Sequence, residues 1–116
     1  MQIPEAVKTR LQSLRRNQRT IASTMENNQI SFAILMETTT DHSTKAAYRV
    51  AHGMGASLID ECRSIANVAD ECLRRDEISY DELVDLAMRA NRVSAKFNAL
   101  LAELSKARQL SVAEEN

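Results

Sequence analysis

Glycine, proline and aromatic residues are scarce in this chain of 116 residues. It contains 2 glycines, 1 proline and no tryptophan, and 3% of its residues are aromatic. A many-stranded sheet needs glycine and proline in its turns, so this composition argues against one. Hydrophobic residues still make up 44% of the chain, whose length is typical of one domain. The composition therefore favours a single all-α domain.

Long apolar runs and an excess of charge of one sign are also missing. The longest apolar run, residues 32–36, is far shorter than the roughly 20 residues of a membrane span. Lys and Arg total 15 and Asp and Glu total 16, so no overall field attracts nucleic acid or membranes. The first residues lack the basic and apolar regions of a signal peptide. We therefore expect a cytoplasmic protein without a membrane segment.

The two cysteines, Cys62 and Cys72, lie ten residues apart in a segment with helical periodicity. On one helix they would be about 15 Å apart along the axis, which is too far for a disulfide bond. A chain without an export signal is also expected in a reducing compartment. We interpret both residues as buried thiols that act as small hydrophobic side chains.

Three segments have apolar residues at alternating spacings of three and four, which is typical of helices packed along a seam. We place the helices at residues 4–37, 43–75 and 80–108, followed by a frayed tail at 111–116. Short connections make successive helices antiparallel. The prediction is an all-α, up-down-up bundle of three long antiparallel helices with heptad seams, which dimerisation can complete. The seam positions are Val7, Leu11, Leu14, Gln18, Ile21, Met25, Asn28, Phe32 and Leu35; Thr44, Tyr48, Ala51, Gly55, Leu58, Cys62, Ile65, Ala69 and Cys72; and Leu83, Leu86, Ala90, Val93, Phe97, Leu100 and Leu104.

Polar residues at the helix starts and within the first seam refine this prediction. Ser79 and Glu82 have the spacing of a capping box at the start of the third helix.

Gln18 and Asn28 occupy seam positions where apolar residues are expected. A buried amide needs a partner and can set register or oligomeric state. We interpret Asn28 as buried, whereas Gln18 is either buried or faces solvent beyond the end of a shorter helix.

Residue patterns typical of enzymes and metal sites are not found. Neither His42 nor His52 follows a Glu by three residues, and no Cys-x-x-Cys occurs, so we predict no diiron or zinc site. Gly53 and Gly55 lack the surrounding length and the lysine of a phosphate-binding loop. No strained turn presents a nucleophile beside a base. We predict no enzyme activity, no cofactor and no metal.

The two glycines lie beside His52 within the second predicted helix. Each costs about 1 kcal/mol relative to alanine, so we expect a close helix crossing there. The stretch Val50–Ser57 resembles the phosphoacceptor helix of histidine-phosphotransfer proteins, which implies an exposed His52 that accepts phosphate from a response regulator's aspartate. Those proteins usually carry a lysine at the position of Gly55. Phosphotransfer is thus an alternative function, and a partly buried histidine with a local hydrogen bond is the other interpretation.

Charge is unevenly distributed along the chain. Residues 8–19 include five basic and no acidic side chains, and residues 60–85 include nine acidic and three basic ones. An antiparallel helix pair would place these segments together, so intramolecular ion pairs are one interpretation. Alternatively, Arg15, Arg16 and Arg19 contact an acidic partner surface or phosphates. Nucleic-acid binding is the weaker form of this alternative, because no aromatic residue interleaves with the basic ones.

These observations predict a small non-enzymatic protein–protein interaction module of the adaptor, regulator or inhibitor type, acting through long helical surfaces. Apolar residues outside the first two seams exceed the needs of one narrow core, and exposed apolar patches usually mark interfaces. We expect a homodimer formed through the first or second helix. The surplus apolar residues are Ile30, Ile34, Met36, Ile59 and Leu73. The predicted partner-binding residues are Arg15, Arg16, Arg19, Ile30 and Ile34.

Overall fold

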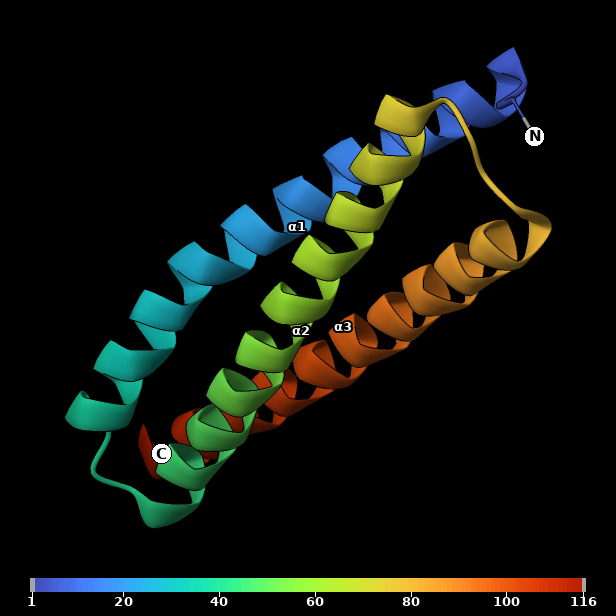
Figure 1. Ribbon diagram of the computed structural model, residues 1–116. Coiled ribbons are helices and arrows are strands. Elements are labelled where there is room, and N and C mark those ends of the chain that lie inside the picture. The colour runs from blue at the N-terminus through green and yellow to red at the C-terminus, as the bar shows by residue number, and fades with distance from the viewer. Residues whose placement is uncertain (1, 116) are drawn as a thin grey trace.

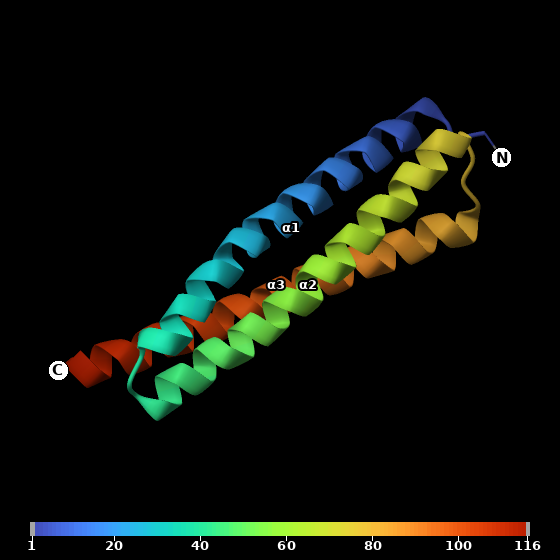
Figure 2. The same cartoon turned by 60° about the vertical axis from the view of Figure 1, so that its left-hand side comes forward.

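The computed structural model describes the backbone of residues 2–115 and the side chains of residues 2–110. These residues form three helices, α1 (Glu5–Thr38), α2 (His42–Arg75) and α3 (Tyr80–Glu115). Successive helices are antiparallel and make a rod of 60 × 19 × 17 Å (Figures 1 and 2). The predicted all-α up-down-up bundle is therefore confirmed. Within the described residues, no helix is both long and apolar enough to span a membrane.

The third helix continues past the end predicted from the sequence. We expected it to stop near residue 108 and to be followed by a frayed tail, but α3 extends to Glu115. The last residue, 116, lies outside the described part of the chain. The prediction relied on the end of the apolar seam at Ala107, whereas the next residues contain no glycine or proline and include good helix formers. Helix propagation needs only one new hydrogen bond per residue, so a helix can continue where the apolar seam ends.

The second helix occupies the centre of the bundle and packs against both of the others (Figure 1). Every predicted seam residue of α2, from Thr44 to Cys72, is buried. Among the described residues, no Cα of α1 comes within 8 Å of a Cα of α3. The bundle therefore consists of two close helix pairs that share α2, with a wider separation between α1 and α3.

The seams of α1 and α3 are buried at only every second position. The buried residues recur every seven positions and are Leu11, Gln18, Met25 and Phe32 in α1 and Leu86, Val93, Leu100 and Ala107 in α3. The alternate positions are half-buried or exposed, namely Val7, Leu14, Ile21, Asn28 and Leu35 in α1 and Leu83, Ala90, Phe97 and Leu104 in α3. One seam position of each heptad is thus buried, whereas the other is only partly covered, and most of its apolar members pack against the edge of the core.

This alternation explains why the two amide side chains of the first seam differ in burial. Gln18 belongs to the buried set and is 5% exposed, whereas Asn28 belongs to the other set and is half-buried. Asn28 was expected to be buried, and it is only partly so. Asn28 donates a long hydrogen bond to the Met25 sulfur at 3.9 Å. Within the described residues, the Gln18 Oε1 atom is buried and has no hydrogen-bond partner.

The cysteines are free and buried, as the sequence predicts. Burial raises the pKa of Cys62 to about 11, and it also raises the pKa of Cys72. Both side chains are therefore neutral thiols near pH 7. They belong to the same hydrophobic core as Leu58 and Ile65, where they act as small apolar groups on the central helix.

The two glycines of α2 have different environments. Gly55 is buried, and a Cβ added there would lie 2.9 Å from Cδ of Gln29 on α1. The Gln29 amide uses this space to donate a 2.8 Å hydrogen bond to the His52 carbonyl oxygen. Gly53 is exposed, and a Cβ there would meet nothing within 4 Å. The space beside Gly55 is therefore filled by a side chain of α1, and the close helix crossing expected at the glycine pair stays a prediction.

The connection between α2 and α3 is held by the predicted capping box. The Glu82 N–H donates to Ser79 Oγ, and the Ser79 N–H donates to Glu82 Oε1, each at 3.0 Å. Arg75, at the end of α2, donates to Glu82 Oε2 at 2.9 Å. The backbone hydrogen bond from Ser79 and the contact with Arg75 lower the pKa of Glu82 to about 2. Glu82 therefore joins the last turn of α2 to the first turn of α3.

We predict that Gly53→Ala raises the free energy of unfolding by about 0.5–1 kcal/mol, because alanine is that much better than glycine inside a helix. Gly55→Ala should give a smaller gain or a loss, because the Gln29 amide must move and a hydrogen bond of about 1 kcal/mol breaks. Urea denaturation measures both changes. Equal gains from the two substitutions would contradict the role assigned to Gln29.

The carboxylate of Glu82 should make stability depend on pH. Because folding lowers its pKa from 4.5 to about 2, its contribution is complete above the unfolded value and is lost as the pH falls through the folded value. At pH 7, Glu82→Gln should therefore unfold at a lower temperature than the original chain. The difference should shrink as the pH falls from about 5 to about 2. Thermal melts at several pH values test this, and a difference independent of pH would exclude an ionic role.

Candidate functional site

The basic start of α1 and the acidic end of α2 form intramolecular ion pairs. Lys8 Nζ lies 3.3 Å from Asp76 Oδ1, and Arg15 Nη1 lies 2.7 Å from Asp70 Oδ1. The hydrogen bond from Arg15 lowers the pKa of Asp70. These pairs are those expected from the antiparallel arrangement of the two segments. Arg15, one of the predicted partner-binding residues, is therefore engaged within the chain.

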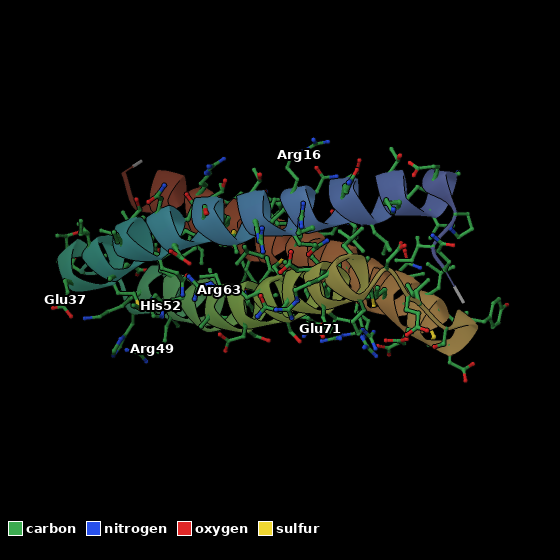
Figure 3. The ribbon with its side chains drawn as sticks, turned by 45° about the horizontal axis from the view of Figure 1, so that its top comes forward. Arg16, Glu37, Arg49, His52, Arg63 and Glu71 are labelled. Carbon is green, nitrogen blue, oxygen red and sulfur yellow. The ribbon has the colours of Figure 1, made fainter. Side chains whose placement is uncertain are left out.

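Other predicted partner-binding residues lie on the side of α1 that faces away from the bundle. We call this side the α1 outward face. It consists of exposed residues spaced by three or four positions, namely Gln12, Arg16, Arg19, Ser23, Asn27, Ile30 and Ile34. Figure 3 shows Arg16 pointing outward, on the side opposite to Arg49 and Glu71 of α2. The structure thus joins Arg16, Arg19, Ile30 and Ile34 into one continuous surface.

The α1 outward face has a cationic end and an apolar end. Within the described residues, neither Arg16 nor Arg19 forms an ion pair within 4.0 Å; Arg19 acts on Asp70 only at longer range. Ile30 is 64% exposed and Ile34 is 57% exposed. Hydroxyl and amide side chains occupy the stretch between the two ends. This combination of free cations and exposed isoleucines is suited to binding another macromolecule.

The remaining apolar residues outside the predicted seams serve the interior. Ile59 is buried, and Met36 and Leu73 are half-buried and pack against the core. The expectation that all five are surplus was therefore wrong for these three. The reason is that α2 packs against a helix on each of two sides. The apolar contact area of α1 and α2 is therefore wider than one heptad seam. Ile30 and Ile34 are the two of this set that remain exposed.

His52 lies on the side of α2 that faces α1 and is half-buried. Its carbonyl oxygen accepts the hydrogen bond from Gln29, which holds the backbone at this position. Figure 3 shows His52 near Arg49 toward the end of the bundle that contains Glu37. The described residues include no group of His, Cys, Asp and Glu side chains that could hold a metal ion. His52 is partly exposed, so phosphotransfer through it stays a prediction.

A second exposed apolar surface, on α3, is not among the residues singled out from the sequence. Tyr80, Val84 and Met88 are 77%, 38% and 57% exposed. They are spaced four residues apart and lie outside the third seam, and this spacing is the signal that could have found them. Exposed hydrophobic side chains therefore lie on α3 as well as on α1, and Val50 of α2 is a further one.

Comparisons with known proteins give no relative for this chain. No protein-family model, no curated protein and no solved structure matches it.

The different environments of Arg15 and Arg16 give a direct test of the charge assignment. Arg15→Gln removes the partner of Asp70 and should slightly lower the melting temperature, with a smaller effect at high salt because partly exposed ion pairs are screened. Arg16→Gln should leave the melting temperature unchanged. Thermal melts at low and high salt measure both effects. An equal loss for the two variants would show that the ion pair with Asp70 does not distinguish these arginines.

Proposed function

We propose that this chain is a non-enzymatic interaction module that binds another protein through the α1 outward face. One observation carries the proposal, namely that a single helix of 34 residues presents along one line two strongly exposed isoleucines and two arginines that form no ion pair with the described residues. Apolar residues exposed together on a soluble domain usually belong to an interface. A continuous helix also holds the four side chains at nearly fixed separations.

The spacing of these residues defines the complementary surface. Arg19 and Ile30 are eleven residues apart, which corresponds to about 17 Å along a helix. A matching partner therefore presents carboxylates at one end and an apolar patch about that distance away. Burial of the isoleucine side chains in the interface supplies most of the affinity. The arginines orient the partner and increase the association rate at low salt.

The charge pattern favours a protein partner over nucleic acid. Of the basic side chains in residues 8–19, Lys8 pairs with Asp76, directly after α2, and Arg15 pairs with Asp70 of α2. Few cations remain to follow a phosphate backbone, and no aromatic residue interrupts this basic segment to stack on bases.

The proposal places the binding of the partner protein in the cytoplasm. It also includes the self-association that the sequence predicts.

The proposal is tested by affinity capture from the native host, with partners identified by mass spectrometry and the interaction then measured with purified proteins. The double variant Ile30→Ser, Ile34→Ser should lose the partner. Val50→Ser, which removes an apolar side chain that is 48% exposed on α2, is the matched control and should retain it. With the purified partner, Arg16→Glu should weaken binding more at low salt than at high salt.

Retention of the same partner by the isoleucine double variant would exclude the α1 outward face as the binding surface. Binding of mixed RNA or DNA that falls steeply with salt, together with no protein partner, would support the nucleic-acid alternative instead.

A further inference from the structure

An apolar groove lies between α1 and α3 at the end of the bundle where both helices begin. It encloses about 430 Å³ and is lined by Val7, Leu11 and Leu14 of α1 and by Leu83, Leu86 and Ala87 of α3. Arg10 also borders it and is the one charged residue in the lining among the described side chains. Arg10 is exposed and forms no ion pair within the described residues. The groove therefore has an apolar floor and a positively charged border.

The same end of α3 carries a surface with the complementary properties. We call it the α3 stripe, formed by Tyr80, Val84 and Met88, which are 77%, 38% and 57% exposed. Two carboxylates, those of Asp81 and Asp85, accompany these side chains. Asp85 pairs with Arg89 at 3.7 Å, and within the described residues Asp81 forms no ion pair. The stripe is therefore apolar and bordered by negative charge.

We propose that a second copy of this chain occupies the groove, with the α3 stripe of each copy packed into the groove of the other. The apolar side chains of the stripe cover the leucines of the groove, and Asp81 of one copy faces Arg10 of the other. This assignment concerns a surface separate from the α1 outward face. It deepens the self-association included in the proposed function, which the sequence placed on the first or second helix.

The arrangement of the helices favours a copy of the same chain as the occupant. The groove and the α3 stripe both include the first turns of α3. One two-fold axis beside α3 therefore brings the stripe of each copy onto the groove of the other. Because α1 and α3 run in the same direction (Figure 2), the wide side between them accepts a helix that is antiparallel to both, as in a four-helix bundle. A two-fold axis perpendicular to α3 makes the α3 helix of the second copy antiparallel to α1 and α3 of the first.

The bundle itself shows that this side is incompletely packed. No Cα of α1 approaches a Cα of α3 within 8 Å in the described part of the chain. The seam positions that border this separation, such as Leu14 and Leu83, are only half-buried. A helix inserted at this end would complete their burial without moving α2, whose seam is already covered.

The test is sedimentation equilibrium of the full chain over a wide concentration range. The original chain should shift from 13.0 kDa to twice that mass as its concentration rises. Met88→Glu, which places a charge within the contact, should stay a monomer. Val50→Glu adds the same charge at an exposed position of α2 and is the matched control, so it should dimerise like the original chain.

A charge swap tests the pairing of the two surfaces. Arg10→Glu and Asp81→Arg should each weaken dimerisation by about tenfold or more, because each places like charges together. The double variant that combines them should restore it. All of these positions are exposed, and circular dichroism verifies that each variant keeps its helices.

Several outcomes would overturn the inference. One is a monomer at every concentration, and another is a Met88→Glu variant that dimerises normally. A third is a charge-swapped double variant no better than the single ones. A dimer lost in Ile30→Ser, Ile34→Ser but kept in Met88→Glu would place self-association on the α1 outward face instead. Loss of partner capture in the isoleucine variant with an intact dimer would leave this inference standing, so the failures of the two proposals are distinguishable.

Discussion

The packing of α2 against two neighbours is the constraint on which the rest of the structure depends. Its seam is continuous and is built largely of small or compact residues, among them Ala51, Gly55, Cys62 and Ala69, all of which are buried. Small side chains let a neighbouring backbone approach closely, so α1 and α3 each pack against α2 more closely than against each other. The core is thus centred on one helix, and the side between the other two is left wide.

The same arrangement decides which charges are free. The two close pairs of helices carry separate sets of ion pairs, since Arg15 of α1 reaches Asp70 of α2 and Lys96 of α3 reaches Glu61 of α2. Partly exposed pairs of this kind add little stability individually. Among the described residues, Arg16 and Arg19 on the outer side of α1 and Asp81 at the start of α3 form no ion pair within 4.0 Å.

The two proposed surfaces are compatible with each other. The α1 outward face and the groove lie on different sides of α1, because the groove is lined by seam residues such as Leu11 and Leu14 while the outward face contains Ile30 and Ile34. A dimer formed through α3 would leave one outward face free on each copy. Such a dimer would present two equivalent binding surfaces on a rigid body, and it would gain avidity for a partner that is itself repeated.

The sequence by itself determined the helical class, the antiparallel order, the capping box at Ser79 and the burial of the cysteines, because all of these follow from periodicity and neighbouring residues. Only the tertiary structure decided that Gln18 is buried and Asn28 half-buried, and that Gln29 fills the space above Gly55. It also decided that Arg15 is paired with Asp70, whereas Arg16 forms no ion pair in the described part of the chain. A heptad pattern states which side of a helix is apolar. It does not state how far apart two helices lie when they are not consecutive, and that distance, between α1 and α3, decides how much of each seam is covered.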